Sequence, residues 1–256
     1  MGCQAKKVGF LKMHGCGSTS ILNILLRNAR KNNLNLVLPN EGLSFYEDTF
    51  HRGMLKGTLW EKANLSYDMF VLHSRWNHSE IANTLNDHGD VVYISNIRDP
   101  VDMFASIWDK PLNKPRRVNQ TLEEFARSLK SNESQSSSSF KERYGHVLNG
   151  LAPGGFGQGQ FFFRFGSDIT EIGDQITLER KIKDIDAKFD KILITDQDTF
   201  DDSMIILKEA LCWEYKDIVN FKLNSITTDK KSYLSYTGRH NLKGNFIVSS
   251  ENVRYS

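Results

Sequence analysis

The sequence predicts an α/β fold built on a doubly wound parallel sheet. Short apolar runs alternate along the chain with segments whose apolar residues recur at helical spacing. The run at residues 91–97 is rich in β-branched side chains, which is typical of a strand buried on both faces. A glycine- and hydroxyl-rich loop joins the first apolar run to the first helical segment, where open α/β sheets bind their ligands.

The first predicted strand covers residues 8–11, and a helix follows whose apolar face begins at Ile21. Three consecutive hydroxyl residues, Ser18 to Ser20, are candidate caps for that helix. Gly15 and Gly17 allow a tight turn and a close approach of the backbone to a ligand. The loop therefore has the composition of an anion cradle at a helix N-terminus, although an ordinary capped strand–loop–helix corner explains it equally well.

Further elements are expected in order along the next part of the chain. A short strand is predicted at residues 34–38, then loops with a short helical piece at 40–66. Residues 67–73 predict another strand, after which Ser79 is expected to cap a helix. Residues 91–97 form the clearest strand of the chain.

A helix is predicted after Asp99 as N-cap, with Pro100 in its first turn. Thr121 and Glu124 have the spacing of a capping box, and the aromatic residues 161–165 suit a buried position. The remaining elements are a helix at 178–189, a strand at 191–195, a helix from Asp201 or Asp202, and a shorter helix at 215–221.

Length and composition narrow the function classes. The 256 residues suffice for one sizeable domain, predicted at 1–228, with a poorly defined tail at 229–256. A formal charge of +2 argues against a general nucleic-acid binder. The sequence shows neither an apolar run long enough for a transmembrane helix nor a signal peptide. Its three cysteines lack metal-ligand spacing, so no metal is expected.

Polar side chains follow three of the predicted strands. They are the loop residues 12–20, His73 with Arg75, and Arg98 with Ser106. Because ligands bind outside the carboxyl ends of parallel strands, the three groups are expected to converge on one crevice. A guanidinium and a hydroxyl suit a phosphate, although Arg98 has Asp99 and Asp102 nearby as ordinary ion-pair partners.

Several segments together resemble the galactose-3-O-sulfotransferase family, which includes the galactosylceramide (cerebroside) sulfotransferases. Residues 10–19 are similar to its 5′-phosphosulfate loop, and residues 97–101 with Ser106 to its 3′-phosphate motif. Residues 73–77 resemble its His-x-Arg segment. Later blocks follow in the family's order at residues 189–191, 200–204 and 221–225.

The resemblance implies a P-loop-like sulfotransferase fold and 3′-phosphoadenosine 5′-phosphosulfate as the donor. It implies a terminal galactose of a glycolipid or glycan as the acceptor, sulfated at its 3-hydroxyl, and a Golgi location as a type II membrane protein. It says nothing of the oligomeric state. The donor would be held by Gly15, Cys16, Gly17, Ser18, Thr19, Arg98 and Ser106. His73 is the implied general base, and Lys12 and His14 complete the candidate catalytic set.

One position departs from the family pattern, because Gly15 stands where the family has a lysine after the loop histidine. Losing such an electrostatic donor typically costs about 2.7–4 kcal/mol of transition-state stabilisation. Lys12 would partly replace it if its side chain turned toward the loop. A catalytically impaired binding protein is therefore the alternative to an enzyme. A P-loop nucleotide kinase is disfavoured, since no lysine precedes Ser18 and no magnesium-ligand block is evident.

Overall fold

The computed structural model describes two compact units, one of residues 1–98 and 161–224, the other of 99–160 and 225–256. The described residues are 7–40, 42, 44–58, 61, 65–108, 121–124, 127, 160–167 and 174–220. The predicted tail at 229–256 lies outside them, so the domain boundary at residue 228 stays a prediction.

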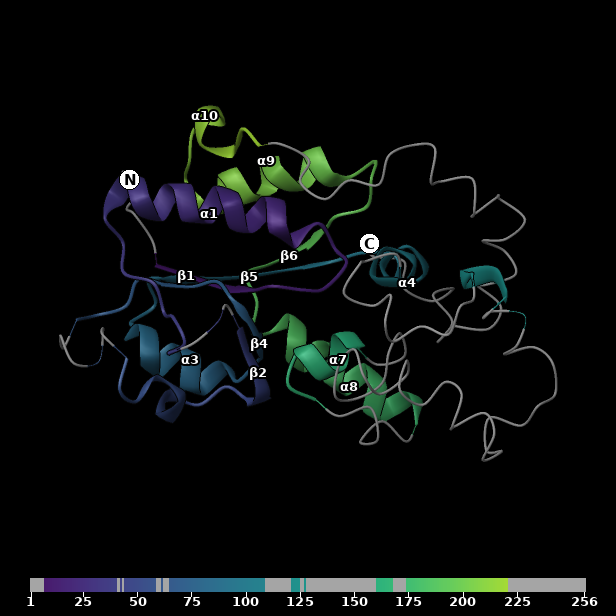
Figure 1. The fold of residues 1–256 in the computed structure, drawn as a ribbon, viewed down its shortest axis with the longest axis horizontal. Helices are drawn as coiled ribbons and strands as arrows, with labels where there is room; N and C mark the ends of the chain where they lie inside the picture. The colour runs from purple at the N-terminus through teal and green to yellow at the C-terminus, as the bar shows by residue number, and fades with distance from the viewer. Residues whose placement is uncertain are drawn as a thin grey trace. The chain divides into compact units, whose positions relative to one another are not determined.

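The first unit is built on a parallel sheet of four strands in the order β3-β1-β5-β6, which confirms the predicted α/β class with a parallel sheet (Figure 1). The strands are β1 (Lys7–Leu11), β3 (Met69–Phe70), β5 (Val91–Ile97) and β6 (Lys191–Ile194). β1 pairs with both β3 and β5, so the loop that follows β1 leaves the middle of the sheet.

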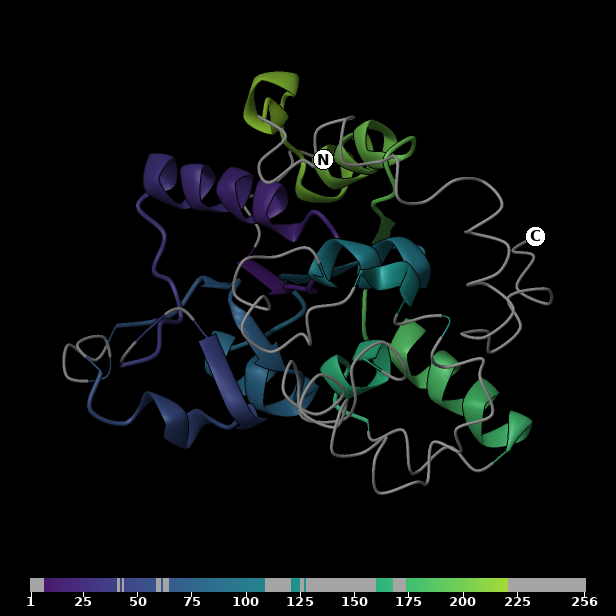
Figure 2. The same cartoon turned by 45° about the vertical axis from the view of Figure 1, so that its right-hand side comes forward.

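Helices lie on both sides of this sheet, as Figures 1 and 2 show. One side has α1 (Ser18–Asn32), α9 (Phe200–Leu211) and α10 (Tyr215–Ile218). The other has α3 (His78–Leu85), α7 (Gln160–Arg164) and α8 (Gln175–Asp186). The helices expected at 178–189 and 215–221 are thus confirmed with shifted ends.

The two faces of the sheet have different cores because side chains alternate along each strand. On the α1 side, Val8 and Phe10 join an aliphatic cluster with residues of α1 and α9. The opposite face is aromatic, with Trp76 packed edge-to-face on Phe70 and Tyr93 and tilted on Phe189. Phe163 and Phe165 are buried, as predicted for the aromatic segment.

The structure corrects two strand predictions. Residues 34–38 form no strand, because only Leu36 bridges to Met69. The strand expected at 67–73 is divided, and its second part, β4 (His73–Arg75), pairs in parallel with the unexpected β2 (Ser44–Thr49) in a separate two-stranded sheet. The short helical piece expected in 40–66 is confirmed as the 3₁₀ helix Arg52–Leu55.

Two of the predicted helix caps are wrong. Gly17, with φ 71°, is the N-cap of α1, in place of the hydroxyl residues that follow it. Asn77 rather than Ser79 caps α3, because its side chain accepts a hydrogen bond from the Glu80 N–H.

The caps predicted at Asp99 and at Thr121 are confirmed in the second unit. Asp99 Oδ1 accepts from the N–H groups of Val101 at 2.8 Å and Asp102 at 3.3 Å, at the start of α4 (Pro100–Trp108). Thr121 and Glu124 exchange the two bonds of a capping box, at 2.7 and 3.2 Å.

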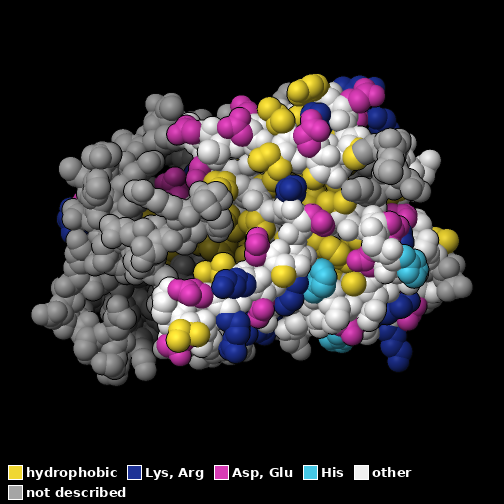
Figure 3. Space-filling model, turned by 180° about the vertical axis from the view of Figure 1, so that it is seen from behind, with side chains coloured by type: hydrophobic (Ala, Val, Ile, Leu, Met, Phe, Trp, Pro, Cys, Tyr) yellow, Lys and Arg dark blue, Asp and Glu magenta, His cyan; other side chains and the backbone are white. Residues whose placement is uncertain are grey.

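Acidic and basic side chains are interspersed over the described part of the surface seen from behind, and neither sign dominates that view (Figure 3). This distribution agrees with the nearly balanced charge of the sequence. Each of the helices that the structure describes is too short or too polar to traverse a bilayer.

Adding a side chain at Gly9 tests how tightly the aromatic face of the sheet is packed. A Cβ at this position would lie 2.6 Å from Tyr93 Cδ1, and the Tyr93 hydroxyl is held by Asp87 at 2.9 Å, so the ring has little freedom to move. We expect Gly9→Ala to lower the free energy of unfolding by about 1–3 kcal/mol in chemical denaturation. Asn83→Ala, on the exposed side of α3, is the control and should change it by less than about 0.5 kcal/mol. An unchanged Gly9→Ala variant would contradict this packing.

Candidate active site

The loop between β1 and α1 turns through two glycines in the left-handed region. Gly15 and Gly17 both have φ 71°, a conformation that glycine adopts without the steric penalty of a Cβ. Gly17 is exposed, and the helix that begins after it has 15 residues. The first N–H groups of a helix lack partners within the helix, and its dipole favours negative charge there. The loop can therefore bind an anion through its backbone.

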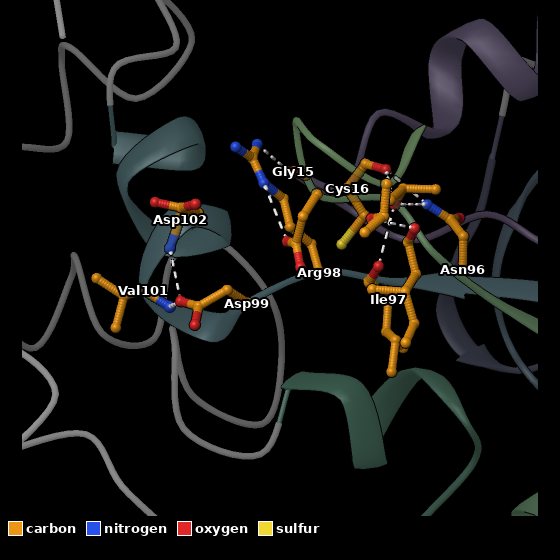
Figure 4. Close-up of polar contacts among 12 residues, drawn as sticks. Gly15, Cys16, Asn96, Ile97, Arg98, Asp99, Val101 and Asp102 are labelled. Carbon is orange, nitrogen blue, oxygen red and sulfur yellow. Dashed lines mark hydrogen bonds and ion pairs between the residues drawn. The ribbon is translucent and has the colours of Figure 1, made fainter. Parts of the chain in front are cut away.

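A buried hydrogen-bond network holds this loop against two strands of the sheet (Figure 4). The Cys16 carbonyl accepts from Asn96 Nδ2 and from Thr195 Oγ1, each at 2.6 Å. Asn96 Nδ2 also donates to Thr195 Oγ1 at 2.9 Å. Asn96 belongs to β5 and is completely buried, and Thr195 follows β6 directly. The network therefore fixes the loop to the middle and to one edge of the sheet.

The Ser18 hydroxyl belongs to the same network. It donates to the Met13 carbonyl at 2.6 Å and lies 2.9 Å from Asn96 Oδ1, and the side chain is buried. The hydroxyl has one proton to donate, and that proton is used within the protein. The backbone N–H of Ser18 is therefore the group of this residue that can donate to a ligand. Thr19, the next residue, is partly exposed, whereas Cys16 is fully buried.

Arg98 reaches the loop from the end of β5. Its Nη1 donates to the Gly15 carbonyl at 3.3 Å, and its Nε lies 4.0 Å from the Asp196 carboxylate (Figure 4). Asp196 comes directly after Thr195 at the end of β6. The structure thus brings Arg98 to the loop, as the strand-end argument predicted. Ser106 lies on α4 and is partly buried within the second unit.

His73 joins the loop from the other side, at the start of β4. Its Nδ1 lies 2.9 Å from the Lys12 carbonyl, and its ring stacks on His14 with centroids 4.0 Å apart and planes 9° from parallel. A carbonyl can only accept a hydrogen bond, so Nδ1 bears the proton and Nε2 has the lone pair. The structure therefore brings together three candidate catalytic residues, Lys12, His14 and His73.

The surroundings of His73 keep its imidazole neutral. Burial is the largest effect, and electrostatic interactions with His14, Lys12 and Arg164 add to it, so the pKa of His73 falls far below the ordinary 6.5. The hydrogen bond to the Lys12 carbonyl acts in the opposite direction and is smaller. The predicted catalytic role of the Lys12 side chain stays a prediction, since Lys12 contacts His73 through its backbone carbonyl.

Sequence reasoning missed three residues of this region. Asn96 and Thr195 lie within or directly after apolar strands, and a polar residue in such a run is the signal that could have identified them. Arg164, near His73, is a single charge in an aromatic segment that was read only as buried structure. Among the described residues, no group of three or more His, Cys, Asp or Glu side chains has the arrangement of a metal site.

Comparisons with known proteins agree with the motifs. A family model described as galactose-3-O-sulfotransferase matches residues 2–244. The human galactosylceramide sulfotransferase is 26% identical over 234 residues, which are 87% of this chain and 49% of that protein. The mouse galactose-3-O-sulfotransferase 2 is 29% identical over 233 residues, 88% of this chain and 54% of that protein. The chain thus spans about half the length of these relatives.

The two hydrogen bonds that the Cys16 carbonyl accepts can be tested by a double-mutant cycle. We expect Asn96→Leu and Thr195→Val each to lower the free energy of unfolding by about 1–3 kcal/mol, because each removes a buried donor. Both donate to one carbonyl and to each other, so the double variant should lose less than the sum. Thr84→Val, whose hydroxyl bonds to Glu80 within α3, should add to Asn96→Leu in full. Full additivity of Asn96→Leu with Thr195→Val would refute the network.

The neutral state of His73 predicts a pH dependence of stability. Below pH 6.5 the unfolded chain takes up a proton on this residue and the folded chain does not, so stability is retained above pH 6.5 and lost as the pH falls. This histidine contributes up to about 1.4 kcal/mol per pH unit to the slope. Denaturation between pH 7.5 and 5 should show a shallower slope for His73→Gln than for the wild type.

His78 contributes to the same slope, since burial lowers its pKa as well, and the comparison therefore depends on the difference between the two proteins. His88→Gln, at an exposed position, is the control and should keep the wild-type slope. Equal slopes for His73→Gln and the wild type would show that His73 is not held neutral.

Proposed function

Because the chain belongs to the galactose-3-O-sulfotransferase family, we propose that it is a carbohydrate sulfotransferase of the P-loop-like type. Its donor is 3′-phosphoadenosine 5′-phosphosulfate. The enzyme transfers the sulfuryl group of this donor to the 3-hydroxyl of a terminal galactose. The acceptor is a glycolipid such as galactosylceramide, or a glycan, in keeping with the names of its relatives. The resemblance to the family favours the Golgi lumen as the compartment.

The observation that best supports the proposal is the hydrogen bond between His73 and the Lys12 carbonyl. It joins the candidate base to the loop that would hold the donor. The proton on Nδ1 directs the lone pair of Nε2 away from that carbonyl, which is the state a general base requires. Arg98 contacts the same loop at Gly15. A base, an anion-binding loop and a guanidinium therefore belong to one assembly.

The proposed reaction assigns a role to each group. Backbone N–H groups at Gly17, Ser18 and Thr19 hold the 5′-phosphosulfate, and Arg98 holds the 3′-phosphate. A part for Ser106 in binding that phosphate stays a prediction from the family motif. The galactose oxygen attacks sulfur in line, the bond from sulfur to the bridging oxygen breaks, and His73 Nε2 accepts the hydroxyl proton. The 3′,5′-bisphosphate of adenosine leaves. Positioning and charge stabilisation supply most of the rate, as in phosphoryl transfer.

The second candidate is a binding protein that retains the donor site and transfers sulfate poorly. Gly15 is the observation that favours it, because the family pattern has a lysine there. The left-handed backbone of Gly15, at φ 71°, disfavours any other residue by about 1–2 kcal/mol. Restoring the lysine therefore adds a charge and strains the loop together, and an experiment has to separate the two effects.

Transfer of labelled sulfate to galactosylceramide and to lactose tests the proposal. We expect turnover by the wild type, a loss of about 10²–10³-fold in Arg98→Ala and of about 10²–10⁴-fold in His73→Gln. Gly15→Lys is compared with Gly15→Ala, which has the same backbone strain without the charge. A wild type without turnover, together with activity in Gly15→Lys alone, would support the impaired binding protein.

Binding of the adenosine 3′,5′-bisphosphate provides the control, since both candidates require it. A wild type that neither turns over nor binds the bisphosphate would overturn the donor site. Competition by ATP without any effect of the bisphosphate would instead favour a nucleotide kinase.

A further inference from the structure

Asn77 begins a sequence motif that the proposed reaction does not use. Asn77, His78 and Ser79 form an Asn-x-Ser sequon, which is the acceptor sequence of N-linked glycosylation in chains that enter the secretory pathway. Further sequons begin at Asn64, Asn119 and Asn132, and these asparagines lie outside the described residues. The structure therefore describes the surroundings of the sequon at Asn77.

The sequon lies at the N-terminus of α3, shortly after β4. Asn77 has φ −132° and ψ 100°, an extended conformation, so its side chain points away from those of Trp76 and His78. The Trp76 ring is buried, and the rings of Trp76 and His78 pack on Tyr93 with centroids 6.0 and 4.5 Å from it. These two neighbours attach the sequon to the aromatic face of the sheet. Asn77 is partly exposed, and Ser79 is exposed.

The two polar atoms of the Asn77 carboxamide have different surroundings. Its Oδ1 accepts a hydrogen bond from the Glu80 N–H at 3.4 Å, which caps the helix, and another from the Ser79 hydroxyl at 3.0 Å. Its Nδ2 is the atom to which an N-glycan is attached. Within the described part of the chain Nδ2 makes no hydrogen bond, and it is not a buried atom. A glycan and the helix cap would therefore use different atoms of the same side chain.

Helix capping alone explains only part of this motif. Asparagine is a preferred N-cap, so capping accounts for Asn77 and for the bond from Glu80. It does not require a hydroxyl two positions later, because the cap is complete once Oδ1 accepts a backbone N–H of the first turn. The Ser79 hydroxyl is bonded to the same Oδ1, on the exposed side of the helix start. The sequon accounts for both residues.

We infer that Asn77 is an N-glycosylation site, an inference that rests on the lumenal compartment of the proposed function. The modification joins Asn77 Nδ2 to the anomeric carbon of an oligosaccharide that is carried on a lipid diphosphate. The bond from that carbon to the diphosphate breaks, the lipid diphosphate leaves, and Nδ2 loses one proton. The product is still an amide, so its oxygen continues to cap α3.

Peptide mass spectrometry tests the inference on the full chain, delivered to the lumen of cultured animal cells by a cleavable secretory leader. Enzymatic release of N-glycans in heavy-oxygen water converts each glycosylated asparagine to a labelled aspartate. We expect the label at Asn77 in the wild type and in Ser79→Thr, and its loss in Ser79→Ala, because the acceptor sequence requires a hydroxyl residue there. An unlabelled Asn77 in the wild type would overturn the inference.

Asn77→Asp separates the glycan from the cap. Aspartate caps helices about as well as asparagine but has no amide nitrogen, so this variant should fold like the wild type and lose the glycan. In electrophoresis it should migrate faster than the wild type by the mass of one glycan, and enzymatic removal of all glycans should abolish the difference. Asn83→Gln, at an exposed asparagine of α3 outside any sequon, is the matched control and should migrate like the wild type. Equal migration of Asn77→Asp and the wild type would contradict the inference.

The readout distinguishes the site from the proposed reaction. A glycan at another sequon but not at Asn77 would overturn the inference and leave the proposed function untouched. A chain that is glycosylated at Asn77 but transfers no labelled sulfate would support the inference and count against the proposed enzyme. Because the leader delivers the chain to the lumen, these outcomes test the site and not the compartment.

Discussion

The Cys16 carbonyl is the point on which the candidate site depends. Two buried donors from β5 and from the end of β6 converge on it at 2.6 Å, and Ser18 closes the network from the first turn of α1. The loop is therefore fixed by bonds to the sheet, although its own residues are small and permissive. Arg98 lies two positions after Asn96, directly after the end of β5. One strand thus both holds the loop and delivers the guanidinium that contacts it.

The second constraint is the bond from His73 to the Lys12 carbonyl. β4 belongs to the small sheet with β2 and not to the main sheet, so its position relative to the loop is not set by main-sheet pairing. The side-chain bond and the stacking on His14 supply that link. In the proposed reaction, the distance between base and donor loop is consequently determined by side chains, whereas the distance from Arg98 to the loop is determined by the sheet.

The sequence predicted those strands and site residues that are determined by the pattern of neighbouring residues. β1 and β5 are buried apolar runs, and β6 is a short apolar run at the sheet edge. His73 and Arg98 were found through the rule that ligands bind at the carboxyl ends of strands. β2 was missed because Ser44–Thr49 is largely polar and pairs with a partner 29 positions later, from Ser44 to His73. Ser18 was taken for a cap because local preference favours it there, but a tertiary bond to Asn96 claims its hydroxyl. Arg164 has no local signal, since only the fold brings α7 to β4.

The left-handed turn at Gly15 also limits which residues this position accepts. In that conformation the Cβ of any other residue, lysine included, is strained against the backbone. A side chain could be introduced there without strain only if the turn itself adopted another backbone conformation. Substitution at this one position is therefore coupled to the shape of the whole loop, which the hydrogen bonds to the Cys16 carbonyl hold in place.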